Sequence, residues 1–184
     1  MNIWITSDTH FGHDREFLYG KRGFEYVTEH DAAIINNWNS IVKSDDTVYL
    51  LGDVFLGDQD HGIECLKQLN GQIHIICGNH DTDTKIKLYE QCENVVEIKL
   101  AERLKYGKHN YFLSHYPTLS GNITDDGCWR KTTWNCCGHS HTQDKFADLD
   151  KGPIIHCELD AWNNYPVSID EIESDIRDFY GIKE

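Results

Sequence analysis

Side chains that can bind a metal ion or move a proton follow several short apolar runs of this 184-residue chain. One group, Asn79, His80 and Asp81, comes after the apolar run 73–77 and a glycine at position 78. Its amide oxygen, imidazole and carboxylate suit a hard or borderline cation and a substrate that must receive a proton. A buried strand that ends in a glycine turn brings short polar side chains into one space, so the group predicts a site at a strand end.

Four further groups repeat this placement of histidine or aspartate after an apolar run. They are Asp8 with His10, Asp53, His115, and His139 with His141. Together with Asn79 they supply seven donors, enough for two sets of four ligands if one carboxylate is shared. A shared carboxylate can hold two divalent ions roughly 3.5–4 Å apart, with a bridging hydroxide as nucleophile. That arrangement suits in-line hydrolysis of a phosphoester without a covalent enzyme intermediate.

At these residues the chain resembles the calcineurin-like metallophosphoesterase superfamily. The superfamily pattern is D-x-H, GD, GNH[DE], H and GHxH, and all five blocks occur in this order between residues 8 and 141. The stretches 7–13 and 160–168 are also similar to the small phosphoesterases of bacteria and their phages. With these stretches the resemblance covers nearly the whole chain.

The resemblance implies a role for each donor. One ion would be held by Asp8, His10 and His141, the other by Asn79, His115 and His139, and both by the bridging and catalytic Asp53. His80 would face the phosphate, stabilise the pentacoordinate transition state and protonate the leaving oxygen, a duty that suits an imidazole with its pKa near neutrality. Asp81 would orient His80 or a ligand.

Two long connections are candidates for the rim of the site. Residues 11–27 predict either a loop that contacts substrate or an aromatic lid on the core, and 116–132 predict a second rim. The basic residues best placed to bind the substrate phosphate, beside Asn79 and His80, are Arg15, Lys21 and Arg22. Five further histidines are expected to be surface or hydrogen-bonded residues, with His13 closest to a motif: His13, His61, His74, His109 and His156.

Alternating strand and helix patterns organise the first half of the chain. Strands are predicted at 2–7, 46–51, 73–77 and 94–100, and helices at 29–42, 60–69 and 84–92. This order favours a right-handed α/β unit with a largely parallel sheet. Ligands of such sheets gather at the carboxyl ends of the strands.

The second half contains strands with little helix between them. They are predicted at 109–114, 133–138 and 153–159, before a last helix that a capping box at Ser168 and Glu171 opens and that runs to about residue 180. We therefore predict an α/β fold of two packed mixed β-sheets flanked by helices, a four-layer α/β/β/α sandwich. It would form a single domain over residues 1–184.

The composition restricts the partners and the compartment. A net charge of −14, from 31 acidic and 17 basic residues, repels nucleic-acid backbones, so tight duplex binding is not expected. The longest apolar stretches are of strand length, far below the roughly 20 residues of a membrane-spanning helix. Seven cysteines cannot all pair, and the N-terminus lacks a signal-peptide pattern. We expect reduced cysteines and a cytoplasmic location.

Two departures from the superfamily pattern bear on the substrate. After Asp53 there is no acid at position 56 and no arginine follows, which argues against the phosphoserine phosphatase branch. After His115 comes Tyr116, with the proline one position later, so the local turn is not fixed by the pattern.

Together these observations predict a metal-dependent phosphoesterase that hydrolyses a small phosphodiester or nucleotide-type phosphoester. Its cofactors would be two divalent ions, Mn²⁺ first, with Fe, Zn or Ni as alternatives. Two other functions stay open: a noncatalytic scaffold of the same fold, and a nuclease that acts on single-stranded nucleic acid. The sequence leaves the natural substrate and the oligomeric state undecided.

Overall fold

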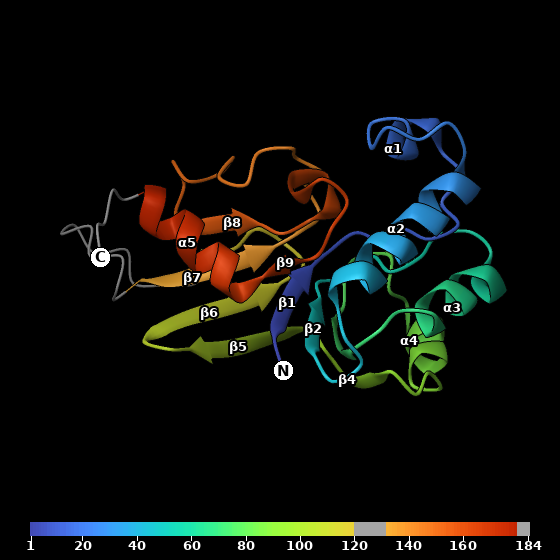
Figure 1. Cartoon of the computed structure of the whole chain (residues 1–184), viewed down its shortest axis with the longest axis horizontal. Helices are drawn as coiled ribbons and strands as arrows, with labels where there is room; N and C mark the ends of the chain where they lie inside the picture. The colour runs from blue at the N-terminus through green and yellow to red at the C-terminus, as the bar shows by residue number, and fades with distance from the viewer. Residues whose placement is uncertain (120–131, 180–184) are drawn as a thin grey trace.

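Two β-sheets with helices packed on them make up the fold (Figure 1). The computed structural model describes residues 1–119 and 132–179. The first sheet contains β1 (Ile3–Thr6), β2 (Thr47–Leu50), β3 (Gln72–Ile76), β4 (Val95–Lys99) and β9 (Val167–Ser168). The second sheet contains β5 (Ala101–Tyr106), β6 (His109–Ser114), β7 (Thr133–Cys137) and β8 (Ile154–His156).

Both sheets mix parallel and antiparallel neighbours. In the first sheet the order is β4-β3-β2-β1-β9, and only the last pair, β1 with β9, is antiparallel. In the second sheet the order is β5-β6-β7-β8, and only β5 with β6 is antiparallel. The predicted fold class, α/β with two mixed sheets and flanking helices in one domain, is confirmed.

Helices connect the parallel strands of the first sheet, as the alternating pattern predicts. They are α2 (Val27–Ile41), α3 (Gln59–Lys67) and α4 (Asp83–Tyr89). Asp58 is the N-cap of α3, and its carboxylate accepts hydrogen bonds from the backbone N–H groups of Asp60 and His61. These N–H groups lie in the first turn, where no helical carbonyl is available to accept them. The predicted helices are present, with small differences at their ends.

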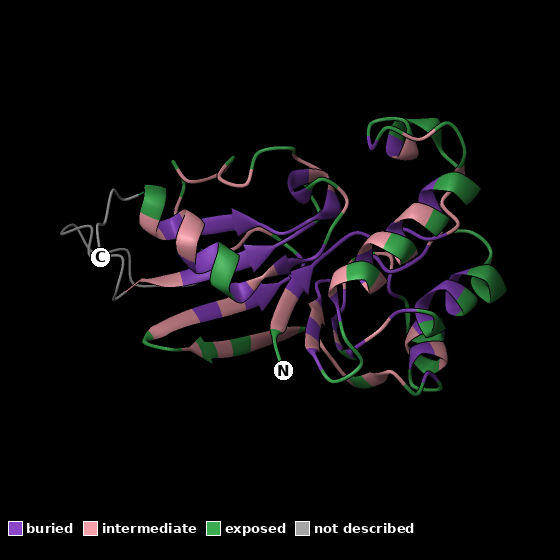
Figure 2. Ribbon diagram, viewed as in Figure 1, coloured by how far each residue is buried: buried purple, intermediate pink, exposed green. Residues whose placement is uncertain are grey.

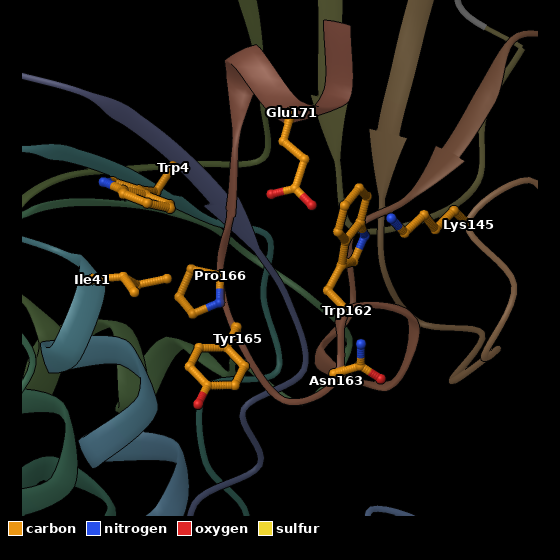
Figure 3. Close-up of a pocket in the computed structure, with 8 residues that line it drawn as sticks. All are labelled: Trp4, Ile41, Lys145, Trp162, Asn163, Tyr165, Pro166 and Glu171. Atoms are coloured by element: carbon orange, nitrogen blue, oxygen red, sulfur yellow. The ribbon is translucent and has the colours of Figure 1, made fainter. Parts of the chain in front are cut away.

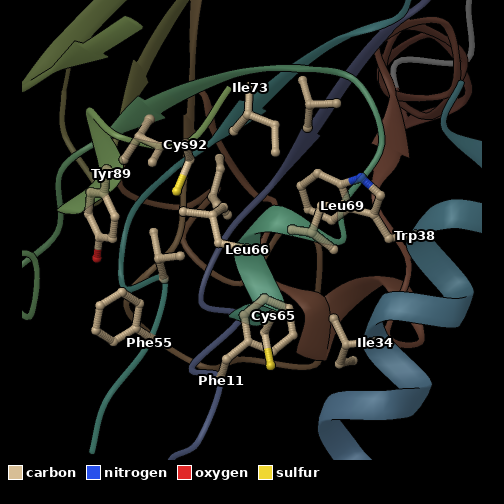
Figure 4. Close-up of a cluster of buried hydrophobic side chains, with 14 of the residues drawn as sticks. Phe11, Ile34, Trp38, Phe55, Cys65, Leu66, Leu69, Ile73, Tyr89 and Cys92 are labelled. Carbon is tan, nitrogen blue, oxygen red and sulfur yellow. The ribbon is translucent and has the colours of Figure 1, made fainter. Parts of the chain in front are cut away.

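Successive residues of the first sheet alternate between two hydrophobic cores, as the period of a strand requires. Val48 and Leu50 belong to the first core, where Trp38 of α2 and Leu66 of α3 pack with them (Figure 4). Leu51, the next residue, belongs to the second core. The sheet is therefore apolar on both faces.

The second core is shared by the two sheets and the last helix, α5 (Ile169–Phe179). Ile5 of β1 lies in one buried cluster with Leu113 of β6, Cys136 of β7 and Ile172 of α5. Figure 2 shows the strands of this region as largely buried. Burying these side chains fixes the second sheet against the first, so the strand ends of both sheets meet at one place.

Four short elements were not predicted. They are α1 (Glu16–Tyr19), the 3₁₀ helix η2 (Leu159–Trp162), β5 and β9. The strand β5 has a sequence rich in charge, AERLKY, because it is the edge of its sheet and faces solvent with alternate residues. The helix α1 has only four residues and falls in the segment predicted as a long loop.

The segment before α5 closes over an edge of the first sheet. The Ser168 hydroxyl accepts a hydrogen bond from the Glu171 backbone N–H, which confirms the predicted start of the helix. A surface pocket lies here, lined among others by Trp4, Trp162 and Glu171 (Figure 3). None of the predicted metal ligands lines it. The larger loop 116–132 lies mostly outside the described residues.

The described residues include no helix long and apolar enough to cross a membrane. Six of the seven cysteines are described, and all six are free and buried. Cys136 and Cys157 pack in the second core, as expected of reduced cysteines that act as small apolar side chains.

A buried histidine fixes the chain that follows residue 141. His156 Nδ1 lies 3.1 Å from Glu158 Oε1, and its Nε2 lies 3.2 Å from Asp148 Oδ2. Burial alone lowers the pKa of His156, but its hydrogen bonds to the two carboxylates outweigh burial and raise the pKa above the ordinary value. Glu158 Oε1 also accepts the Thr142 N–H at 3.2 Å. This network therefore anchors the start of the loop at Thr142.

Replacing His156 by glutamine should destabilise the fold most at low pH. Because the pKa of His156 is raised by folding from 6.5, its protonated form contributes fully below that pH, and the contribution is lost as pH rises through the raised pKa. Breaking the pair with buried Glu158 should cost about 3 kcal/mol at about pH 6. Urea unfolding of wild type and variant at about pH 6 and about pH 9 measures this difference.

The matched control is His74→Gln, which breaks a half-exposed pair with Glu97. It should change the free energy of unfolding by less than about 1 kcal/mol at either pH. A His156→Gln effect that stays constant across the two pH values would contradict a protonated His156.

Candidate metal centre

The predicted ligands follow the carboxyl ends of five strands, three from the first sheet and two from the second. Asp8 follows β1, Asp53 follows β2 and Asn79 follows β3. From the second sheet, His115 follows β6, while His139 and the nearby His141 follow β7. Because β1, β2 and β3 are parallel, and β6 and β7 are parallel, the ligand-bearing ends lie on the same side within each sheet.

One group of donors comprises Asp8, His10 and His141. Asp8 Oδ1 lies 3.6 Å from His10 Nε2 and 3.6 Å from His141 Nε2. The two imidazole Nε2 atoms are 3.2 Å apart. The three ligand atoms thus surround a point that one cation could occupy.

A second group comprises Asp53, His115 and His139, with Asn79 beside them. His115 Nε2 lies 3.0 Å from Asn79 Oδ1, 3.2 Å from His139 Nδ1 and 3.5 Å from Asp53 Oδ2. These four side chains could form one further ligand set.

Asp53 lies between the two groups. Its Oδ2 is 3.7 Å from His10 Nε2 of the first group and 3.5 Å from His115 Nε2 of the second. Its Oδ1 accepts the backbone N–H of His80 at 2.9 Å, which fixes the orientation of the carboxylate. A single oxygen of Asp53 therefore faces both candidate positions, as a bridging ligand must.

The hydrogen bonds of the donors are compatible with a cation. His115 Nδ1 lies 2.7 Å from the Leu51 carbonyl oxygen, which can only accept, so Nδ1 donates to it. Nε2 is left to face the oxygens of Asn79 and Asp53, and in a neutral ring it presents a lone pair to them. In the first group, Asp8 Oδ1 is buried without a hydrogen-bond partner among the described residues. An orphaned buried carboxylate oxygen is stabilised by a positive ion.

The pKa values of two members of the first group, Asp8 and His10, agree with this interpretation. Burial opposes ionisation of Asp8, but the neighbouring His10 and His141 hold the pKa of its carboxyl well below the usual range. Burial lowers the pKa of His10. An ionised carboxylate beside a neutral imidazole is the state in which both groups can ligate a metal.

The backbone at the candidate ligands is strained. Seven described residues other than glycine have φ in the left-handed region, and five of these are proposed ligands: Asp8, His10, Asp53, His139 and His141. Such a conformation costs about 1–3 kcal/mol per residue and persists only where the surrounding structure enforces it. Concentrated strain of this kind is typical of functional sites.

Two glycines permit the close approach of the strand ends. A Cβ on Gly78 would collide with Asp53 Oδ1 and with the His115 ring. A Cβ on Gly138 would collide with Asp8 Oδ2. Glycine is therefore required at these two motif positions because the carboxylates of the site fill the space beside the backbone.

Asp81 orients the loops that carry the proposed metal ligands, and it does not orient His80. Its Oδ2 accepts the backbone N–H groups of Asp53 at 2.7 Å and of Gly78 at 2.8 Å, and its Oδ1 accepts the Tyr89 hydroxyl at 2.6 Å. Of the two alternatives in the sequence analysis, Asp81 therefore positions a ligand, through backbone hydrogen bonds.

Arg22 does not lie where a substrate could reach it. Its side chain is 1% exposed and forms an ion pair with Asp160 at 2.7 Å, while its Nη2 also donates to the Asp8 carbonyl oxygen at 2.7 Å. The prediction that Arg22 contacts the substrate phosphate, made from charge alone, is wrong. The buried carboxylate of Asp160, 138 positions away in sequence, takes this guanidinium instead.

Asp160 in turn orients a proposed ligand that the sequence analysis left without a partner. Asp160 Oδ2 lies 3.1 Å from His141 Nδ1, so His141 donates from Nδ1 and presents Nε2 to the site. Burial would lower the pKa of His141, but this hydrogen bond raises it. The signal that could have identified Asp160 is its place at the start of the second resembling stretch, 160–168.

The remaining predicted residues differ in how they relate to the centre. The side chain of His80 is 40% exposed, with Nε2 3.9 Å from Asp53 Oδ2. Arg15 is exposed. The His13 ring centroid lies 5.3 Å from that of His10, while the other four histidines expected to be unligated are hydrogen-bonded to carboxylates. His13 thus contacts a proposed ligand.

Comparison with known proteins agrees with the site geometry. The profile of the calcineurin-like phosphoesterase superfamily domain matches residues 1–155 of the chain. The chain belongs to this superfamily. The resemblance found in the five motif blocks is therefore confirmed.

Relatives of similar length occur in archaea, phages and bacteria. The chain is 32% identical over 178 residues to the uncharacterized protein MJ1445 of Methanocaldococcus jannaschii, covering 92% of this chain and 88% of that protein. It is 30% identical over 195 residues to the Gene 66 protein of Mycobacterium phage L5, covering 93% and 92%. The crystal structure of AQ665 from Aquifex aeolicus, of unknown function, has a TM-score of 0.70, 25% identity and coverage of 94% and 98%. The present chain therefore shares its fold with AQ665 over nearly its full length.

Replacing Asp160 by asparagine should weaken metal binding by about 10–100-fold, because His141 loses the carboxylate that orients it and raises its basicity. Competition for Mn²⁺ with a chromophoric chelator measures the affinity. Asp175→Asn, which removes the partner of Lys145, is the matched control and should bind Mn²⁺ like wild type. Wild-type affinity in Asp160→Asn would show that Asp160 only serves packing.

Proposed function

We propose that this chain is a dinuclear metal-dependent phosphoesterase that hydrolyses a small phosphodiester or nucleotide-type phosphoester. The observation that carries the proposal is the position of Asp53 Oδ2, which faces His10 of one donor group and His115 of the other. Seven donor residues form two groups that share one carboxylate. Two metal ions bound in this way can bind and polarise a phosphoryl group.

Each donor has a proposed place in this centre. Asp8, His10 and His141 would hold one ion, Asn79, His115 and His139 the other, and Asp53 both. When bound, two divalent ions would supply an activated water at neutral pH and bind the phosphoryl oxygens. Oxygen and imidazole donors suit Mn²⁺ first, with Fe, Zn or Ni as alternatives.

His80 is proposed as the residue that assists at the phosphate. Its backbone is fixed by the hydrogen bond to Asp53 Oδ1, while its imidazole stays 40% exposed beside the centre. An imidazole in this place can donate a hydrogen bond to a phosphoryl oxygen and a proton to the leaving oxygen. Asn79, also exposed, and Arg15 are the further groups proposed to contact substrate.

The residues after Asp53 support a small substrate over a phosphoprotein. Phe55 is fully buried in the first core, so this stretch serves packing. The acid and the arginine that mark the phosphoserine phosphatase branch are missing from it. We assign all 184 residues to one catalytic domain, and the cytoplasmic location stays a prediction from the cysteine content.

Asp53→Asn and His80→Gln should abolish most turnover for different reasons. Asp53→Asn removes the charge shared by both ion positions, so it should lower both metal content and hydrolysis of bis(p-nitrophenyl) phosphate. His80→Gln should keep the metal and lower kcat by about 10²–10⁴-fold, because it removes only the proton donor. Metal analysis and steady-state kinetics with Mn²⁺ separate the two effects.

His74→Gln is a matched control, since His74 pairs with Glu97 outside the donor groups. It should retain wild-type kinetics. Equal activity in wild type, Asp53→Asn and His80→Gln would contradict the proposed function, and so would activity that survives complete removal of divalent ions by a chelator.

A further inference from the structure

An exposed aromatic ring lies directly against the proposed second ion position. The Tyr116 ring centroid is 5.0 Å from that of His115 and 4.8 Å from that of His139, with interplanar angles of 77° and 64°. Tyr116 is nevertheless 49% exposed. Half of its surface is therefore open beside the place where a phosphate would bind.

The backbone of Tyr116 is held rigidly. Its carbonyl oxygen accepts the hydroxyls of Ser114 and Thr118, each at 2.9 Å. Asn135, which is fully buried, accepts the Thr118 N–H at 2.7 Å and donates to the Ser114 hydroxyl at 2.8 Å. These bonds fix the turn that the superfamily pattern left undefined. The backbone that carries the ring is thus preorganised, which lowers the entropy cost of using this surface.

The two arms of a bound diester would have different neighbours. The ring of His80, the proposed proton donor to the leaving oxygen, lies 5.8 Å from that of His10 in the first group. Tyr116 lies against His115 and His139 of the second group. An arm that departs toward His80 would leave the other arm to reach Tyr116.

The charges around the centre favour a phosphate with a single negative charge. Of the three basic residues predicted to bind the phosphate, Arg22 is bound to Asp160, while Arg15 and Lys21 are exposed. The chain as a whole carries a net charge of −14. A phosphodiester bears one negative charge, whereas terminal phosphates add more and would need further cations.

We propose that Tyr116 stacks on the nucleobase of a nucleoside phosphodiester and thereby binds the arm that stays on the phosphate after cleavage. This inference rests on the proposed function and specifies its substrate class. A planar base matches an exposed aromatic face, and such stacking tolerates any base because each has a π-face. The enzyme would therefore discriminate nucleoside esters from alkyl esters.

Two substrates with the same leaving group test the proposal. Thymidine 5′-(p-nitrophenyl phosphate) carries a base on its retained arm, and methyl p-nitrophenyl phosphate carries none. The ratio of their kcat/KM values cancels any effect of a variant on metal loading or on the chemical step. In Tyr116→Ala this ratio should fall about tenfold, mainly through KM for the thymidine ester, which is the size expected for one lost stacking contact.

Tyr116→Phe keeps the aromatic face and should keep the ratio. Tyr26→Ala removes another exposed tyrosine, at the N-cap of α2, and should keep the ratio as well. An unchanged ratio in Tyr116→Ala, with wild type active on both esters, would overturn the stacking role and leave the proposed function intact. Wild type inactive on both esters with Mn²⁺ would instead contradict the proposed function, and the inference with it.

Discussion

The structure depends on one electrostatic constraint: carboxylate and imidazole ligand atoms of each donor group lie within 4.8 Å of one another. His115 Nε2 faces the oxygens of Asn79 and Asp53, and Asp8 Oδ1 is buried beside two imidazoles. In a low-dielectric interior such an arrangement is repulsive unless a positive charge enters it. The donor set therefore makes sense as a cation site, and the surrounding fold can be understood as the means of holding it together.

The site is held together by carboxylates that form hydrogen bonds to the loops and are not proposed ligands of the ions. Asp81 holds the loop of Asp53, Asp160 orients His141, and Glu158 holds the residue after His141. Each of these carboxylates is buried and paired with N–H groups or a cation, so each can offset the backbone strain of the ligand residues. The strained backbone and the carboxylates that support it therefore act together, and they hold the ligand side chains in fixed positions.

The sequence predicted those features of the fold and of the site that a local pattern of apolar and turn residues determines. Short apolar runs located β1, β2 and β3, and the polar residues after them located Asp8, Asp53 and Asn79. It did not predict the edge strand β5, because edge strands are charged and lack a clear apolar alternation. It also placed Arg22 at the substrate, since a cation and its buried partner, Asp160, are far apart in sequence and meet only in the folded chain. Pairings of this kind are decided by packing, which no local pattern encodes.

The acidic surface is compatible with an anionic substrate only because the positive charge is local. A net charge of −14 repels a phosphate at long range, and salt screens this repulsion beyond about 8–10 Å. Within the site, two divalent ions beside Asp8 and Asp53 would reverse the sign of the potential. A further negative charge on a substrate would lie outside the space beside the two ions and would be repelled by the acidic surface. Under the proposed function, this charge distribution would favour small, singly charged phosphoesters, and uncharged contacts such as the ring of Tyr116 would supply affinity beyond the phosphate.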